Sequence, residues 1–304
     1  MVKIDAVFEG GGVKGIAFVG AVTEFERCGY TFCQVAGTSA GSIIASLIAA
    51  GYRAPELAKL MESFDYRALQ QKRGLARIPV VGTWLNLCMK KGIYSADYLQ
   101  NWMQEVLAKQ GIYTFGDLPA GKLKVIVSDI TDAELLVLPD DAHRIGYKPE
   151  ELPIPLAVRM SASIPLYFEP VIVYDKLMPV YVVDGGILSN FPLWIFGDDE
   201  TNPYPTIGFR LHADSKVKPY PIHNLRDYIH AILRTMIQAH DQRYVEQQHA
   251  ARTVFIPTNG IAATQFDLSK EEQVWLYESG VEAAKRFMSR MPGLRRRIKN
   301  EKTS

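Results

Sequence analysis

The stretch Gly37-Thr38-Ser39-Ala40-Gly41 decides the fold of this chain. It follows residues 32–36, which have the pattern of a strand, and it opens the apolar run 42–50, which has the pattern of a helix. A serine between two glycines at a strand-to-helix turn is typical of a nucleophile elbow, where the backbone turns too sharply for larger residues. We therefore expect the Ser39 hydroxyl at the edge of a sheet, near the positive end of the following helix.

A glycine loop precedes this elbow. Residues 2–8 are strand-like and run into Gly10-Gly11-Gly12-Val13-Lys14-Gly15, after which residues 16–28 form an amphipathic pattern that ends at Gly29. Successive glycine amides can curl into a concave nest, which binds a negatively charged oxygen. Acyl transfer through serine needs such donors, so Gly10, Gly11 and Gly12 are the predicted oxyanion hole.

The partner base is predicted at Asp184, which follows the strand-like residues 180–183 and precedes Gly185 and Gly186. An ordinary aspartate has a pKa near 3.9, so an apolar site would have to raise this pKa by desolvation. Asp184 could instead orient a histidine, as in a triad. None of the six histidines lies in a glycine turn, and His230 and His240 fall on a predicted helix. We therefore expect a Ser39–Asp184 dyad.

These glycine motifs together resemble those of the patatin-like phospholipase family. Residues 10–15 match its G-G-G-x-[RK]-G loop, residues 37–41 its G-x-S-x-G elbow, and residues 184–186 its D-G-G block. A small-residue turn ending in proline, residues 161–165, resembles the fourth block, and Asn190 and Pro192 continue the aspartate block. One departure is Lys14, where the family more often has arginine, because lysine cannot form a bidentate fork.

The resemblance implies an α/β fold of three layers, in which a mostly parallel central sheet is flanked by helices. It also implies that Ser39 attacks an acyl ester, that Asp184 is the base, and that Gly10 to Gly12 form the oxyanion hole. The supporting motif positions are Lys14, Gly15, Gly37, Gly41, Gly185 and Gly186. No cofactor and no metal are implied. The expected substrate is a membrane phospholipid or lysophospholipid.

The remaining pattern predicts one domain over residues 1–304, with the motifs in residues 4–192 and a helix-strand-helix portion over residues 206–291. Ser95 is expected to cap a helix, and Ser269 with Glu272 to form a capping box. The segment 74–94 is apolar and is interrupted by glycine and proline. It is expected either to form a lid or to cover the core as a loop. Further helices are expected at 55–72, 96–109, 155–163, 224–251 and 269–291, and strands at 123–130, 135–138, 206–211 and 253–257.

Composition limits the setting. The chain has 304 residues, and 34 lysines and arginines balance 33 aspartates and glutamates, so no global field favours nucleic acid. Three cysteines show neither zinc nor disulfide spacing. No run is long enough to span a bilayer and no secretory leader begins the chain, so we expect a cytoplasmic protein with possible peripheral membrane contact. The basic cluster 295–299 is either a solvated end or a contact for an anionic membrane.

Three other readings compete with a dyad hydrolase. Gly10, Gly12 and Gly15 also satisfy the dinucleotide fingerprint, but no acid ends the second strand to hold a ribose. An α/β-hydrolase with a Ser-Asp-His triad would place its elbow after more strands. A non-catalytic lipid-binding effector would not need Ser39, Asp184 and the glycine loop together. The sequence therefore favours a hydrolase of fatty acyl esters that forms an acyl-enzyme intermediate.

Overall fold

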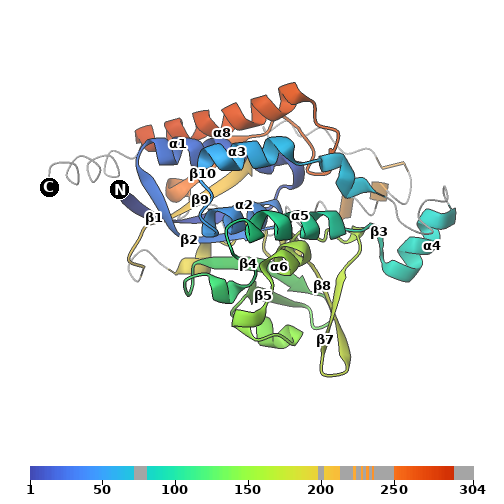
Figure 1. The fold of residues 1–304 in the computed structure, drawn as a ribbon. Helices are drawn as coiled ribbons and strands as arrows, with labels where there is room; N and C mark the ends of the chain where they lie inside the picture. The colour runs from blue at the N-terminus through green and yellow to red at the C-terminus, as the bar shows by residue number, and fades with distance from the viewer. Residues whose placement is uncertain are drawn as a thin grey trace.

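A computed structural model of the protein describes residues 1–71, 81–197, 202–212, 222–223, 227–228, 231–232, 235 and 250–290. Its centre is a sheet with the strand order β10-β9-β1-β2-β4-β8-β7, in which β5 also pairs with β4 (Figure 1). The strands are β1 (Val2–Phe8), β2 (Tyr30–Thr38), β4 (Leu123–Asp129), β5 (Glu134–Leu138), β7 (Val171–Asp175), β8 (Met178–Asp184), β9 (Thr206–His212) and β10 (Thr253–Pro257).

The sheet is mixed, with its parallel part around the glycine motifs. Strands β10, β9, β1, β2 and β4 run parallel, whereas β5 and β8 join β4 antiparallel and β7 joins β8 antiparallel. Because the carboxyl ends of parallel strands meet at one edge, the loops after β1 and β2 lie side by side. The antiparallel pairing of β8 with β4 sets Asp184 opposite Val127. The predicted α/β class with a mostly parallel sheet is confirmed.

Helices cover the sheet, and the first and last described helices pack closely against each other at two glycines. The described α-helices are α1 (Ile16–Arg27), α2 (Ala40–Ala49), α3 (Ala54–Ser63), α4 (Val81–Lys90), α5 (Asp97–Ala108), α6 (Ile154–Ser161) and α8 (Lys270–Arg290). Helix α8 lies along α1 (Figure 1). A Cβ on Gly20 would strike the Tyr277 carbonyl, and one on Gly280 would strike the Ala17 carbonyl. The two backbones can therefore approach only because both residues are glycine.

Both faces of the sheet are buried. On one face, Phe8 stacks on Phe209 with ring centroids 4.9 Å apart, and Phe25 of α1 meets the edge of the same ring at 5.2 Å. Phe287 of α8 packs on Phe25 at 6.2 Å, which ties the C-terminal helix to this core. On the other face, Val7 belongs to a smaller apolar cluster that is completed by the segment 191–196. Such aromatic packing is a large part of core stability.

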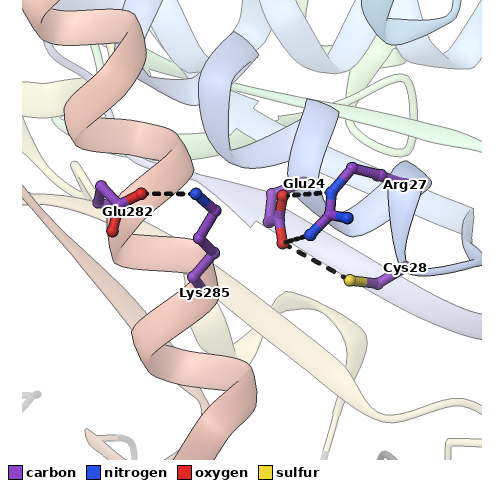
Figure 2. A network of polar contacts seen from close by, with 5 residues as sticks. All are labelled: Glu24, Arg27, Cys28, Glu282 and Lys285. Carbon is purple, nitrogen blue, oxygen red and sulfur yellow. Dashed lines mark hydrogen bonds and ion pairs between the residues drawn. The ribbon is translucent and has the colours of Figure 1, made fainter.

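A polar network sits where α1 meets α8 (Figure 2). The buried Glu24 carboxylate accepts from Arg27 Nε at 2.8 Å and Nη2 at 2.6 Å, and from the Cys28 thiol at 3.6 Å. Glu282 and Lys285 pair at 2.6 Å on the neighbouring face of α8. The Arg27 hydrogen bonds hold the pKa of Glu24 below its usual range, so the carboxylate stays charged although its side chain is buried.

Several expected elements agree with the structure. Ser269 and Glu272 form the capping box: Glu272 N donates to Ser269 Oγ at 3.2 Å, and Ser269 N donates to the Glu272 carboxylate at 2.8 Å. Ser95 Oγ accepts from Asp97 N at 3.2 Å, at the start of α5. The expected helix 224–251 and the basic cluster 295–299 fall wholly or mostly outside the described residues.

The prediction of one helix over residues 55–72 is wrong. Helix α3 ends at Ser63, and the 3-10 turn η2 (Tyr66–Gln70) follows, because Asp65 accepts from Arg67 N and Ala68 N and so starts a new turn. The expected irregular segment 74–94 instead contains helix α4 and the strand β3 (Gly92–Tyr94); its residues 74–80 lie outside the described part.

Three strands were not expected: β3, its partner β6 (Leu166–Phe168), and β7.

Within the described residues, no helix combines the length and the apolar character needed to cross a bilayer.

Candidate active site

Ser39 occupies the sharp turn between β2 and α2. Its backbone has φ 52° and ψ −123°, a conformation that strains a residue with a side chain, typically by about 1–3 kcal/mol. The flanking glycines make the turn possible. A Cβ on Gly37 would strike the Gly41 carbonyl, and a Cβ on Gly41 would strike the Phe8 carbonyl. The elbow predicted from the sequence is therefore present, with its serine 6% exposed.

Hydrogen bonds hold the strained turn in place. Ser39 N donates to Ser161 Oγ at 2.8 Å, and Ser161 Oγ donates to the Ile126 carbonyl at 2.6 Å. Ser42 Oγ donates to the Ser39 carbonyl at 2.6 Å. The fully buried Ser161 thus links α6, β4 and the elbow. The sequence placed Ser161 in a small-residue turn but gave it no role; its signal was a serine at a buried position of a short apolar helix.

Asp184 lies at the end of β8, next to Ser39. Its carboxyl interacts with the Ser39 side chain, and its Oδ1 accepts from Gly186 N at 2.8 Å. The residue is 3% exposed. Burial raises the pKa of Asp184 to about 7, although the interactions with the Ser39 side chain and with Gly186 N oppose this rise. The structure therefore brings together the two residues that the sequence singled out, 145 positions apart.

The glycines after Asp184 leave room for this arrangement. A Cβ on Gly185 would strike the Ile126 carbonyl of β4. A Cβ on Gly186 would lie 2.9 Å from Asn190 Oδ1 and 3.0 Å from Asp184 Oδ1. Asn190 was noted in the sequence only as a continuation of the D-G-G motif. In the structure its side chain lies next to Gly186, and its Nδ2 donates to the Gly10 carbonyl at 3.3 Å.

The glycine loop lies beside the serine, but its three amides are not equivalent. Gly10 N donates to the Asn190 carbonyl at 3.1 Å, so it is engaged within the protein. In the described part of the chain, the amides of Gly11 and Gly12 have no acceptor. A Cβ on Gly10 would lie 3.2 Å from Ser39 Cβ, which shows how close the loop comes. The oxyanion hole of Gly10, Gly11 and Gly12 stays a prediction, and in this structure the amides of Gly11 and Gly12 are the two that remain available for it.

A buried ion pair anchors the start of this loop. Glu9, 4% exposed, accepts from Leu211 N at 2.5 Å and pairs with Arg210 Nε at 3.3 Å. The Arg210 guanidinium also lies over the Phe191 ring, 6.0 Å from its centroid. Sequence reasoning overlooked Glu9 and Arg210, because nothing in the local pattern shows that β9 pairs with β1.

The end of the loop forms the 3-10 turn η1 (Gly12–Gly15). Gly12 has φ 58°, and a Cβ there would strike the Ala263 carbonyl. Lys14 N donates to the Gly11 carbonyl at 3.3 Å. Gly15 is less constrained, because a Cβ at that position would make an ordinary 3.4 Å contact with Ala40 Cβ.

Ser39 lines an apolar cavity of about 620 Å³, a volume that includes the part open to solvent. Helices α2, α3 and α5, the turn η2 and strand β6 supply its walls. Among the described residues that line it, only Ser39, Tyr66 and Trp102 bring a polar side-chain atom, and none is charged. The apolar lining consists of Val13, Ile43, Met61, Phe64, Leu69, Leu99, Ile164, Phe168, Phe266 and small residues.

No described histidine completes a triad. The interactions found for these two side chains join Ser39 to Asp184 and Asp184 to Gly186 N, and His143, His212 and His223 make none with either residue. His230, His240 and His249 lie outside the described residues. Within the described ranges, histidine, cysteine and acidic side chains form no group of three that could hold a metal ion.

The fold and the site define an α/β protein with a serine–carboxylate pair whose serine lines an apolar cavity. The model of the family described as "Patatin-like phospholipase" matches residues 6–196, and the chain belongs to this family. The Bacillus subtilis protein YqhO is 39% identical, over 94% of this chain and 98% of its own length. Protein R571 of Acanthamoeba polyphaga mimivirus is 28% identical, over 92% of each chain.

Solved structures show the same fold at low sequence identity. VipD from Legionella pneumophila superposes with a TM-score of 0.57 and 17% identity, covering 94% of this chain and 66% of VipD. ExoU, in its complex with SpcU from Pseudomonas aeruginosa, gives a TM-score of 0.52 at 17% identity and is covered over 51% of its length. An NTE family protein of Mycobacterium tuberculosis is 27% identical over 62% of this chain and 27% of its own length.

Proposed function

We propose that the protein hydrolyses fatty acyl esters of membrane phospholipids or lysophospholipids through a Ser39–Asp184 dyad. The observation that carries the proposal is the interaction of the Ser39 side chain with the buried Asp184 carboxyl, beside an apolar cavity that Ser39 lines. Membership of the patatin-like phospholipase family supports a lipid substrate.

Asp184 acts as the base in this scheme. With its pKa raised to about 7, a large fraction of the carboxyl is ionised at neutral pH and is basic enough to take the Ser39 proton. Ser39 Oγ then attacks the ester carbonyl carbon. The amides of Gly11 and Gly12 stabilise the negative oxygen, and the proton held by Asp184 passes to the departing alcohol.

A second half-reaction releases the fatty acid. Asp184, ionised again, takes a proton from water, and the resulting hydroxide attacks the acyl-Ser39 carbonyl. The same two amides stabilise the second tetrahedral oxygen. When the bond to Ser39 Oγ breaks, the proton returns from Asp184 to the serine.

The cavity is suited to the acyl chain rather than to the head group. Each buried methylene contributes about 0.8 kcal/mol, whereas a charged head group would find no partner among these apolar walls. The head group would therefore remain outside, and the acyl chain would lie against α3, η2 and α5.

Turnover of a lipid panel tests the proposal. Purified protein is expected to release fatty acid from phospholipid or lysophospholipid vesicles, and Ser39→Ala is expected to lose turnover and labelling by a fluorophosphonate probe. Ser63→Ala is the matched control, because Ser63 is exposed and, among the described residues, bonds only the Leu60 carbonyl of its own helix. Probe labelling that survives in Ser39→Ala, or full activity in Asp184→Asn, would contradict the dyad.

A further inference from the structure

The hairpin of β7 and β8 ends in exposed apolar side chains. Leu177 is 91% exposed, Met178 70% and Tyr174 63%, and Lys176 in the turn is exposed as well. The pairing of β7 with β8 continues after the pairing of β8 with β4 has ended, so the hairpin extends past β4 (Figure 1). Single exposed apolar residues are common on protein surfaces, whereas a group of them at the end of a projecting element indicates a contact surface.

The apolar character continues along the outer face of the hairpin. Val173 and Val180 pair with each other and are buried, so the inner face packs against the protein. On the outer face, Ile172 is 44% exposed and is followed by Tyr174. The solvated face of an antiparallel pair normally carries polar side chains. The outer face and the turn together therefore form a surface that is poorly suited to water.

The strand register places the hairpin on the same edge of the sheet as the nucleophile. Ile126 of β4 pairs with Thr38, which precedes Ser39, and the next residue, Val127, pairs with Asp184. Because β8 runs antiparallel to β4, its amino end lies beyond the edge at which β2 ends. That end of the seven-residue strand is about 20 Å from Asp184, at about 3.3 Å per residue.

The hairpin is also continuous with the wall of the cavity. Phe168 of β6 lines the cavity, and only Glu169 and Pro170 separate it from β7. Near the base of the hairpin, Lys91 Nζ lies 5.1 Å from the centroid of the Tyr181 ring. A contact made by the hairpin would therefore be made beside the cavity that Ser39 lines.

We propose that the hairpin tip, which consists of Tyr174, Lys176, Leu177 and Met178, inserts into the surface of a lipid bilayer. A protein partner or a second copy of the chain would need about 20 to 30 residues on each side, far more than this tip offers. A bilayer surface needs only a few apolar side chains, and it suits tyrosine and lysine, which combine an apolar body with a polar end. The proposal rests on the proposed hydrolase function and adds the surface that meets the lipid.

Vesicle binding tests the proposal without turnover. Ser39→Ala, which cannot hydrolyse the lipid by the proposed mechanism, is sedimented with vesicles of equal parts phosphatidylcholine and phosphatidylglycerol. The same measurement is made after adding Leu177→Ser with Met178→Ser. The affinity for the vesicles is expected to fall about tenfold or more, because two large apolar side chains no longer leave water. The Tm should stay the same, because both side chains are exposed.

Tyr113→Ser, also in Ser39→Ala, is the matched control. Tyr113 is 53% exposed, and its carbonyl accepts from Ile154 N at 3.1 Å, at the first residue of α6. The last residue of α6, Ser161, bonds Ser39, so the length of this helix separates Tyr113 from the elbow. Vesicle binding should be unchanged in this variant. An equal loss in both variants, or no loss in the hairpin variant, would overturn the inference.

Turnover of two substrates separates a membrane contact from an effect on the site. In the protein that retains Ser39, the hairpin variant should lose hydrolysis of vesicle lipid and keep its kcat/KM for a water-soluble short-chain fluorogenic ester. Equal losses on both substrates would overturn the inference, because the hairpin would then act on the cavity. A dimer that the hairpin variant dissociates, with vesicle binding unchanged, would also overturn it in favour of a second copy of the chain.

The two proposals fail in different ways. If no ester is hydrolysed in a Ser39-dependent manner, the proposed function fails, while vesicle binding by Ser39→Ala still decides whether the tip contacts a membrane. If esters are hydrolysed but vesicle binding does not depend on Leu177 and Met178, the function stands and the membrane contact of the hairpin is refuted.

Discussion

Replacing Asp184 with asparagine should change how the stability of the protein depends on pH. Asparagine has the shape of the neutral carboxylic acid and can still accept from Gly186 N, so the local structure should be retained. It cannot ionise. The variant therefore removes one titration and leaves the others in place, and the difference between the two stability curves isolates Asp184.

The magnitude follows from the two pKa values of Asp184. The pKa is about 7 in the folded protein, against an ordinary value of 3.8, so the folded state holds its proton more tightly. A group with a raised folded pKa contributes stability that is fully present below the unfolded pKa and is lost as pH rises through the folded one. At about 1.4 kcal/mol for each pH unit between these values, the loss is about 4 kcal/mol between pH 4 and pH 8.

Urea unfolding of both proteins at pH steps from 4 to 8 provides the assay. The free energy of unfolding of the unaltered protein, minus that of Asp184→Asn, should fall with rising pH by about 4 kcal/mol in total and level off above pH 7. A difference that stays constant across this range would mean that Asp184 titrates at the same pH in the folded and unfolded states. Burial would then not raise its basicity, and the reasoning that makes it a base would be refuted.

The remaining predictions concern activity and the elbow. The kcat/KM for ester hydrolysis should rise with pH to a plateau with an apparent pKa near 7, because only ionised Asp184 accepts the Ser39 proton; a profile flat from pH 5 to 9 would contradict this. Ser161→Ala should lower kcat about tenfold or more with little change in KM, since it removes the acceptor of Ser39 N, and Ser161→Thr should restore part of the rate if the hydroxyl is what matters. Gly10→Ala should abolish activity because its Cβ meets Asn190 Oδ1 and Ser39, whereas Gly15→Ala, with an ordinary 3.4 Å contact, should remain active; equal activities would contradict the steric argument. Ser39→Gly should unfold at a higher free energy than Ser39→Ala by about 1 kcal/mol, because glycine relieves the strain at φ 52°, and urea unfolding of the two inactive variants measures it.

The sequence predicted the structure best at the glycine motifs, where the residues allow only one backbone conformation. Gly37 and Gly41 allow only a tight turn around Ser39, and their removal would place side chains on backbone carbonyls. Gly186 likewise leaves no space for a Cβ beside Asp184. The order of strand, glycine loop, helix, strand and elbow could therefore be predicted from residues 2–50, and the structure confirms it.

What the sequence did not reveal depends on contacts between distant segments. The ion pair of Glu9 with Arg210 exists because β9 pairs with β1, about 200 residues away, and no local pattern specifies that pairing. The engagement of Gly10 N by Asn190 has the same origin. By contrast, β7 was a missed local signal, because its apolar residues and the following Lys176-Leu177 turn are typical of a hairpin.

The end of helix α3 could also have been predicted from the sequence. Asp65 stands where a new turn begins and satisfies two amides, which is common chemistry for aspartate at a helix start. A single longer helix would have carried Tyr66 away from the position it has in the cavity wall. The size and shape of the cavity, however, depend on how α2, α3 and α5 pack, and only the three-dimensional structure shows that.

The segment recognised as the family ends at residue 196, yet β9 and β10 continue the same sheet and α8 packs along α1. Shortening the chain to that boundary would leave β1 as an unprotected edge and would expose Phe8 and Phe25, which Phe209 and Phe287 now shield. It would also remove Arg210, which pairs with the buried Glu9 at the start of the glycine loop. The last third of the polypeptide therefore completes the sheet and the core against which the glycine loop and Ser39 are held.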